Sequence, residues 1–229
     1  MSDDRLRVSV FNCEWRASTS DDAAVIRERV LANSPDIVCL TEAYRDFFGA
    51  EGHLIEAAPD YGYPIVEGRR KVMLWSRQPW TAADDHGSDQ LPPGRFVAGR
   101  TTTSIGEINV VGVCIPWARA HVSSGNRNRR PWEDHLAYLS ALNDLLPAPA
   151  LRTLVLGDFN QRVPLRFQSQ LAFDTLSSAL LTRMSLATGG DIEPIGKQAI
   201  DHICHGRDVE CERVTSLSNV ADNGHLISV

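Results

Sequence analysis

An aspartate and an asparagine directly follow a strand-like run in the second half of the chain. The run Thr153 to Leu156 is apolar and β-branched, and Gly157-Asp158-Phe159-Asn160 follows at once. This pattern predicts a buried strand that ends in polar side chains. Because strand side chains alternate, Asp158 and Asn160 should project to one side while Phe159 turns into the core. A turn would also use Asp and Asn for its backbone, so this stretch alone leaves both interpretations open.

Several other candidate strands also end in a carboxylate, an amide or an imidazole. The full set is Asn12, Glu42, Asp158 with Asn160, and near the C-terminus Asp201 and His225. One polar residue after a strand is ordinary turn chemistry. Oxygen ligands that converge on one point would instead suit Mg²⁺ or Mn²⁺. Glu42 follows a fully apolar strand, and there we favour a metal ligand over an exposed, solubilising glutamate.

The elements that must position these side chains alternate between strand and helix patterns. Leu6 to Phe11 predicts a first strand, Asp21 and Asp22 open a helix, and Ile37 to Leu40 predicts a buried strand. This opening implies a layered α/β fold. Further strands are expected at 71–76, 97–104, 108–115, 153–158, 198–205, 212–218 and 226–229, helices at 131–146 and 171–186, and loops at 47–64, 80–95 and 116–130.

Length and composition favour a single domain over residues 1–229. The formal net charge of -6 means that any nucleic-acid contact would have to be local. No apolar run reaches membrane-span length, and the N-terminus lacks the layout of a signal peptide. The five cysteines are odd in number and have no zinc spacing, which favours reduced core thiols in a cytoplasmic protein. No feature indicates an obligate protein partner.

Four short segments together resemble the endonuclease/exonuclease/phosphatase superfamily of metal-dependent phosphoesterases. They are Val10-Phe11-Asn12, Asp36 to Glu42, Gly157-Asp158-Phe159-Asn160 and Ile200-Asp201-His202-Ile203, and they occur in the family's order. The superfamily includes deoxyribonucleases, apurinic endonucleases, neutral sphingomyelinases and inositol-polyphosphate phosphatases. The resemblance implies an α/β (α+β) fold, a four-layer α/β/β/α sandwich of two packed mixed β-sheets flanked by helices, with the active site where the sheets open.

The resemblance also implies roles for the candidate residues. Asn12 and Glu42 would hold the metal, with Glu42 as the principal carboxylate ligand. Asp158 would orient or deprotonate the attacking water, and Asn160 would bind a phosphate oxygen. These roles suit in-line phosphoryl transfer, which needs an aligned nucleophile and a cation against the phosphate charge.

An imidazole and its carboxylate partner complete the implied site. His225 would contact the scissile phosphate as the donor at the developing oxyanion, with Asp201 paired to its other nitrogen. A carboxylate behind an imidazole fixes its tautomer and favours its charged form. We interpret His202, next to Asp201, as an ordinary strand residue.

Two positions depart from the family pattern. The family usually ends Ser-Asp-His, whereas Gly224 stands here before His225, so either Asp222 supplies the metal ligand through a bulge or that ligand is absent. Cys114 stands where nucleases of the family often have His or Tyr. Arg119 or His121 could supply the missing donor, although a solvated loop position explains either residue more simply.

A loop between two tryptophans carries further substrate-binding candidates. Arginine forks bind phosphate bidentately and tryptophan can stack on a base, although solvated loop charges also explain such runs. The candidates are Trp117, Arg119, His121, Arg127, Arg129 and Arg130. A second basic cluster, Arg69-Arg70-Lys71, precedes a predicted strand.

We therefore expect a Mg²⁺-dependent phosphodiesterase or phosphatase, with Mn²⁺ as a substitute metal. Within this class we rank a nuclease acting on DNA or RNA ahead of a small-molecule or lipid phosphodiesterase. The alternative is a protein that keeps the fold, has lost catalysis and binds a nucleic acid or protein partner. The altered C-terminal motif motivates that alternative, whereas the retained polar set argues against it.

Overall fold

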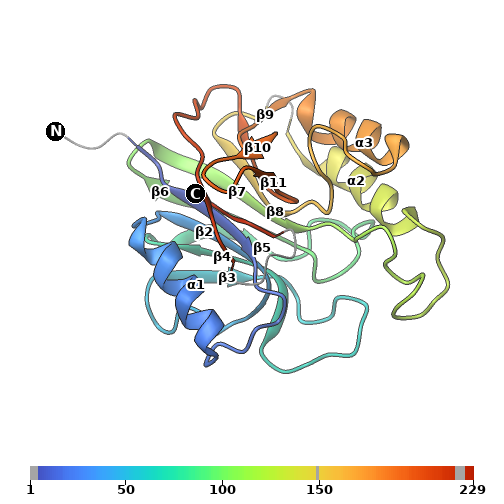
Figure 1. Cartoon of the computed structure of the whole chain (residues 1–229), viewed down its shortest axis with the longest axis horizontal. Helices are drawn as coiled ribbons and strands as arrows, with labels where there is room; N and C mark the ends of the chain where they lie inside the picture. Colours follow the sequence, from blue (N-terminus) through green and yellow to red (C-terminus); the bar gives the residue numbers. More distant parts are fainter. Residues whose placement is uncertain (1–4, 148–149, 220–224) are drawn as a thin grey trace.

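Two six-stranded mixed β-sheets pack against each other in the computed structural model, which describes residues 5–147, 150–219 and 225–229 (Figure 1). The first sheet has the order β13 (Ser216–Leu217), β14 (Ile227–Ser228), β1 (Val8–Asn12), β2 (Ile37–Tyr44), β4 (Arg69–Ser76), β3 (His53–Glu56). The second has the order β5 (Trp80–Asp84), β6 (Phe96–Thr103), β7 (Gly106–Cys114), β8 (Thr153–Asp158), β12 (Asp201–Gly206), β9 (Met184–Leu186). A separate two-stranded ribbon joins β10 (Asp191–Ile192) to β11 (Lys197–Gln198).

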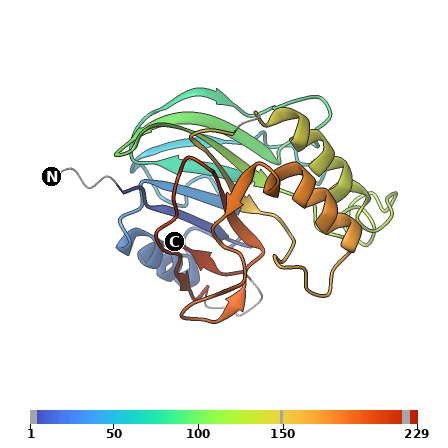
Figure 2. The same ribbon diagram turned by 90° about the horizontal axis from the view of Figure 1, so that it is seen from above.

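Helices cover the outer faces of the two sheets, as Figure 2 shows from above. The helix α1 (Asp21–Ala32) packs on the first sheet, where Ile26 and Val30 meet Phe11. The helices α2 (Glu133–Leu145) and α3 (Gln170–Leu176), with the π-helical turn η1 (Ser177–Leu181), cover the second. A third apolar cluster fills the space between the sheets. The expected four-layer sandwich is therefore confirmed.

The first strand–helix–strand unit follows the predicted chemistry. The Ser20 hydroxyl accepts a hydrogen bond from the Ala23 amide at 3.2 Å, and Asp21 and Asp22 occupy the positive end of α1. The strands β1 and β2 are parallel, as are β7 and β8, and the other strand pairs are antiparallel. No helix within the described ranges is long and apolar enough to cross a membrane.

Several element boundaries differ from the expectation because the strands concerned lie at sheet edges or are very short. The strand β3 lies within the expected loop 47–64 and β5 within 80–95, and both are largely exposed, so neither has the apolar alternation of a buried strand. The expected helix 171–186 ends as η1 and continues into β9. The expected strand 212–218 is reduced to β13.

Strand alternation directs several polar side chains into the space between the sheets. In β1, Asn12 has the same parity as Val10, which belongs to the inter-sheet cluster. In β8, Asp158 has the parity of Leu156, and in β12, Asp201 has the parity of Ile203. Because side chains two apart share a face, these three polar groups project into the seam between the sheets.

Candidate active site

Two aspartates and a histidine meet at the seam between the sheets. Asp158 at the end of β8 is the register partner of Asp201 at the start of the antiparallel β12. With His225 they form a group whose potential ligand atoms all lie within 4.8 Å of one another. Asp158 is 2% exposed and Asp201 is fully buried. The structure therefore brings together three residues that lie far apart in the sequence.

Hydrogen bonds from both sides hold the Asp158 carboxylate. Its Oδ2 accepts from Asn12 Nδ2 at 2.9 Å, and its Oδ1 accepts from the Asn160 amide at 2.9 Å. The pKa of Asp158 is raised from 3.8 to about 7. Burial is the largest cause, the negative charges of Asp201 and Glu42 act in the same direction, and the positive charge of His225 acts against them. Such a carboxylate can exchange a proton near neutral pH.

His225 is held by Asp201. Its Nδ1 lies 2.8 Å from Asp201 Oδ2, and its Nε2 lies 3.8 Å from Glu14 Oε1. Burial alone would lower the pKa of His225. The negative charge and hydrogen bond of Asp201 outweigh this effect, the charges of Asp158 and Glu14 act in the same direction as Asp201, and the pKa rises from 6.5 to about 9. The imidazole is therefore cationic at neutral pH and acts as a donor.

Glu42 lies in β2 with a φ of 50°, and its carboxylate forms an ion pair with Lys71 of the neighbouring strand β4. Lys71 is also close to two aromatic rings, with its Nζ 5.2 Å from the centre of Trp15 and 5.6 Å from that of Tyr61. The structure thus places Glu42 beside the seam, where its charge raises the pKa of Asp158.

The residues at the seam fit a divalent metal ion that prefers oxygen ligands. Asp201 Oδ1 is buried and has no hydrogen-bond partner within the described part of the chain. Asp158, Asp201 and Glu42 also place mutually repelling carboxylates near one another, which is one cause of the raised pKa of Asp158. A hard cation would satisfy the free oxygen and offset this repulsion.

The other predicted site residues lie in different settings. The Asn12 carboxamide uses its oxygen to accept from the Glu14 amide at 2.8 Å while its nitrogen donates to Asp158, so its geometry orients the aspartate. Asn160 donates through Nδ2 to the carbonyl of Ile115 at 2.9 Å. Its role as a phosphate ligand stays a prediction, as does the metal-binding role of Asn12. Asp222 lies outside the described residues.

His202 is the satisfied core histidine that the sequence indicated. It is fully buried, with Nδ1 2.8 Å from Thr188 Oγ1 and Nε2 2.8 Å from the carbonyl of Gln161. Burial lowers its pKa. Both ring nitrogens are thus engaged away from the site.

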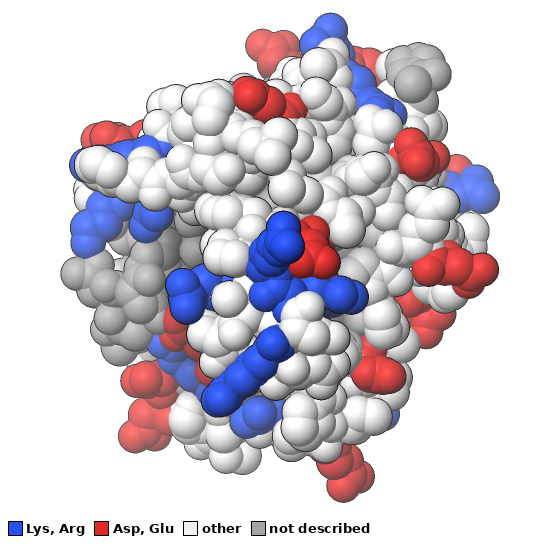
Figure 3. Space-filling model, turned by 90° about the vertical axis from the view of Figure 1, so that its right-hand side faces the viewer, with Lys and Arg blue, Asp and Glu red and all other residues white. Residues whose placement is uncertain are grey.

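The loop after β7 carries the predicted substrate-binding residues on an exposed arm. Trp117 is 43% exposed, and Arg119 and Arg127 lie at the surface. Arg129 is paired with Asp134 at 2.8 Å, so part of its charge is already used. On the face that presents this loop, Lys and Arg side chains gather near the centre (Figure 3). These residues surround the site's approach rather than its centre.

An aromatic stack that the sequence interpretation missed joins this loop to the seam. Trp15 stacks on Tyr61 at 5.6 Å between ring centroids, Tyr61 on Tyr63 at 6.1 Å, and Tyr63 on His121 at 4.6 Å. The Tyr63 hydroxyl also lies 3.0 Å from Ser124 Oγ. His121 is therefore engaged in holding two loops together. These aromatic residues lie in irregular segments, where periodicity gives no signal.

Two further cations, Lys71 and Arg95, lie near the seam. Arg95 was not predicted as a site residue, and Lys71 was indicated only as part of the second basic cluster. Burial raises the pKa of the Cys114 thiol to about 12; Lys71 and Arg95 lower it, whereas Asp158 and Glu42 raise it. The thiol therefore lies within electrostatic reach of all four charged groups. Cys114 itself is buried, and its neutral thiol is at most a weak hydrogen-bond donor.

A separate cavity of about 920 Å³ opens at the opposite ends of the same strands. Its lining includes Val8 at the start of β1 and His205 near the end of β12, and it contains none of the candidate site residues. Charged residues also line this cavity, but the candidate catalytic residues lie at the other end, where β1 and β8 finish.

Comparisons with known proteins agree with this geometry. A model described as the Endonuclease/Exonuclease/phosphatase family matches residues 10–223. A search of curated proteins finds no match. Solved structures match at low sequence identity, which supports the fold alone.

Three of these structures span almost all of the chain. An endonuclease/exonuclease/phosphatase protein from Beutenbergia cavernae DSM 12333 is 18% identical with a TM-score of 0.68, covering 97% of this chain and 70% of that chain. An AP endonuclease from Archaeoglobus fulgidus is 15% identical with a TM-score of 0.66, covering 98% and 99%. A mutant beta toxin from Staphylococcus aureus with bound magnesium ions is 10% identical with a TM-score of 0.65, covering 97% and 98%.

Proposed function

Because the chain belongs to the endonuclease/exonuclease/phosphatase family, we propose that it is a Mg²⁺-dependent phosphodiesterase, and more specifically a nuclease. The observation that carries the proposal is the convergence of Asp158, Asp201 and His225 within 4.8 Å at the seam. Such a set combines a proton acceptor with a cationic donor, the two functions that hydrolysis of a phosphodiester requires.

Asp158 is the proposed general base. Asn12 and the Asn160 amide each bind one of its oxygens, so the carboxylate is fixed in orientation before substrate arrives. It accepts the proton of a water molecule aligned for attack on phosphorus. The raised pKa of Asp158 makes it a better proton acceptor than an ordinary aspartate.

His225 is the proposed electrophilic donor. Asp201 holds Nδ1 and keeps the ring charged, and Nε2–H, which faces Glu14 in the substrate-free protein, would donate to a non-bridging oxygen of the phosphate. The negative charge that develops on that oxygen strengthens this hydrogen bond in the transition state. Asp201 acts through His225 and is a positioning residue.

Glu42, with the Oδ1 of Asp201 that His225 does not engage, supplies the oxygens that would hold the metal. Bound Mg²⁺ would neutralise phosphate charge and polarise the phosphorus–oxygen bonds. Lys71 holds the Glu42 carboxylate beside the seam through their ion pair. The magnesium ions of the structurally similar beta toxin support this assignment by analogy.

The surroundings of the seam support a nucleic-acid substrate over a lipid. The loop with Arg119 and Arg127 offers local positive charge on a chain whose overall charge is negative, and Trp117 is exposed for stacking. The structurally similar AP endonuclease supports the same direction. A small-molecule or lipid phosphodiesterase of the same fold remains the second candidate.

The test is hydrolysis of a substrate panel with Mg²⁺, Mn²⁺ or EDTA. The panel holds single- and double-stranded DNA, RNA, bis-p-nitrophenyl phosphate and sphingomyelin. Turnover should require metal and be abolished by Asp158→Asn, whereas Asp144→Asn on the exposed face of α2 should leave it unchanged. Magnesium titration of wild type and Glu42→Ala measures the metal site independently. Metal binding without turnover on any phosphoester would support the catalytically silent alternative.

A further inference from the structure

Arg95 is a buried cation that the proposed chemistry does not use. It directly precedes β6 and is 4% exposed. Its Nη1 donates to the carbonyl oxygen of Cys114 at 3.2 Å, and no carboxylate within the described ranges forms an ion pair with it. A guanidinium has five N–H donors, and apart from this carbonyl and a 4.0 Å contact to Cys114 Sγ the described residues give Arg95 no side-chain hydrogen bond; its Nε and Nη2 are not among the buried atoms without a partner, so they are open to solvent.

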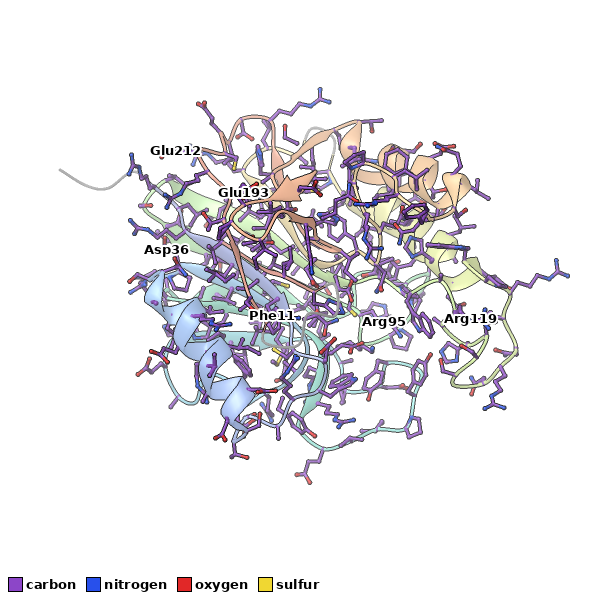
Figure 4. All side chains as sticks on the ribbon, in the orientation of Figure 1. Phe11, Asp36, Arg95, Arg119, Glu193 and Glu212 are labelled. Atoms are coloured by element: carbon purple, nitrogen blue, oxygen red, sulfur yellow. The ribbon has the colours of Figure 1, made fainter. Side chains whose placement is uncertain are left out.

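Arg95 lies beside the candidate site. Cys114, whose carbonyl it binds, is the register partner of Asp158. The next carbonyl, that of Ile115, accepts from Asn160 Nδ2 at 2.9 Å. Arg95 and Asn160 therefore bind successive carbonyl groups where β7 ends. Figure 4 shows Arg95 between the strand ends and the loop that carries Arg119.

The backbone at Arg95 is fixed on several sides. Its carbonyl accepts from Tyr138 Oη at 2.7 Å and from the Cys114 amide at 3.0 Å. The preceding Gly94, at a φ of 66°, approaches the loop below so closely that a Cβ would lie 2.1 Å from the Asp60 carbonyl. The backbone of Arg95 is therefore fixed, and the hydrogen bond from Nη1 to the Cys114 carbonyl anchors one end of its guanidinium before any ligand binds, which lowers the entropic cost of binding.

A largely buried guanidinium with donors still open beside the candidate site can bind an anionic group of the substrate at little cost in further desolvation. Lys71 of β4, which is paired with Glu42, lowers the pKa of the same Cys114 thiol as Arg95 does, so a second cation lies on this side of the seam. Arginine forks match the oxygens of phosphate. We propose that Arg95 is a substrate-binding residue that forms, with Lys71, an anion subsite for a phosphate group next to the scissile phosphodiester. The inference rests on the proposed function.

This subsite selects a class of substrate. A nucleic-acid strand carries a phosphate on each side of the scissile phosphate, and one of these two flanking phosphates would pair with Arg95. A choline headgroup would instead present positive charge to Lys71 and Arg95, an unfavourable like-charge contact. The subsite thus favours a polynucleotide backbone over a choline phospholipid.

The first experiment measures binding of inorganic phosphate by calorimetry in EDTA, so that neither metal nor turnover contributes. Wild type should bind phosphate, and Arg95→Gln should weaken binding roughly 10- to 100-fold. Arg95→Lys should fall between the two, because it keeps the charge but loses the fork. The matched control is Arg100→Gln, at an exposed position of the same strand β6, which should bind like wild type.

The second experiment compares two dinucleotides with the same scissile bond, with and without a terminal 5′-phosphate. Wild type should prefer the phosphorylated one in kcat/KM, and Arg95→Gln should lose the preference while thermal unfolding verifies its fold. If Arg95→Gln does not fold, the phosphate affinity of Arg95→Lys is compared with that of wild type. Equal affinities would overturn the subsite. Phosphate binding without metal-dependent turnover would contradict the proposed function alone, whereas turnover without phosphate preference would contradict the subsite alone.

Discussion

Replacement of Asp201 by asparagine tests how the seam keeps His225 charged. Asp201 is fully buried, and its Oδ2 lies 2.8 Å from His225 Nδ1. Asparagine has nearly the same shape and can still accept the Nδ1–H hydrogen bond, so the substitution removes the charge and preserves the contact. Any change in His225 then reports electrostatics rather than lost packing.

The expected magnitude follows from the environment of His225. The charges of Asp201, Asp158 and Glu14 outweigh burial and raise its pKa from 6.5 to about 9. At about 1.4 kcal/mol per pH unit, this difference favours the imidazolium by about 3 kcal/mol. Asp201 is the largest favourable contributor, and without it burial dominates. The pKa of His225 in Asp201→Asn should therefore fall to about 6.5 or below.

NMR titration of the histidine ring, assigned by His225→Gln, measures this pKa directly. The ring should titrate near 9 in wild type and at least about two pH units lower in Asp201→Asn. At about pH 7.5, turnover should then fall by at least about tenfold, because at a pKa of about 6.5 only about one tenth of the donor is still protonated. Glu14→Gln is the control: its carboxylate lies 3.8 Å from Nε2 and is partly exposed, so its removal should have a smaller effect.

Two results would refute this reasoning. A His225 ring that still titrates near 9 in Asp201→Asn would mean that another group holds the proton. A wild-type ring that titrates near its ordinary value of 6.5 would mean that burial and Asp201 cancel. In either case the imidazolium would lose its proposed role as the donor set up by Asp201.

Further predictions concern stability, metal linkage and the loops. Gly157→Ala should lower the free energy of unfolding by about 3 kcal/mol or more and Tm by roughly 6–12 °C, because at its φ of 136° the new Cβ would lie 1.9 Å from a β7 carbonyl oxygen. The control is Gly49→Ala, also at positive φ but in open space, which should lower the free energy of unfolding by only about 1 kcal/mol. The pKa of about 7 at Asp158 means that the metal-free fold binds an extra proton between about pH 4 and 7 and loses stability as pH rises through that window. Mg²⁺ competes with this proton, so it should raise Tm more at about pH 8 than at about pH 6, and equal rises would contradict the linkage. Tyr63→Phe removes the hydroxyl that meets Ser124 and should speed tryptic cleavage of the loop 116–130 roughly three- to tenfold; unchanged cleavage would show that stacking alone holds the loop.

Most of the architecture can be predicted from local sequence patterns within single helices and strands. Acids at Asp21 and Asp22 and a serine cap define the start of α1, and buried apolar runs define β2 and β8. Edge strands escape this reasoning, because β3 and β5 have largely exposed side chains and owe their conformation to pairing with β4 and β6. That pairing is a tertiary property that no window of sequence contains.

The candidate site divides in the same way. Asn12 and Asp158 end buried strands and Asp201 begins one, and strand parity places all three on the seam face. Lys71 is indicated by sequence only as part of the basic cluster Arg69-Arg70-Lys71, and its ion pair with Glu42 is not, because the β2–β4 pairing sets it. Arg95 escapes because an arginine before a strand normally reads as a surface loop residue, and only the packing of Tyr138 and β7 buries it.

The charge balance of the seam depends on both sheets at once. Asp158 and Asp201 face each other on neighbouring strands of the second sheet, where two buried carboxylates repel. Their cation, His225, comes from the first sheet, because the chain just after it pairs with β1 at Val10 and Ser228. Asn12 crosses from the same sheet to bind Asp158. Neither sheet alone can therefore stabilise the aspartate pair, and the site forms only when the two sheets pack together.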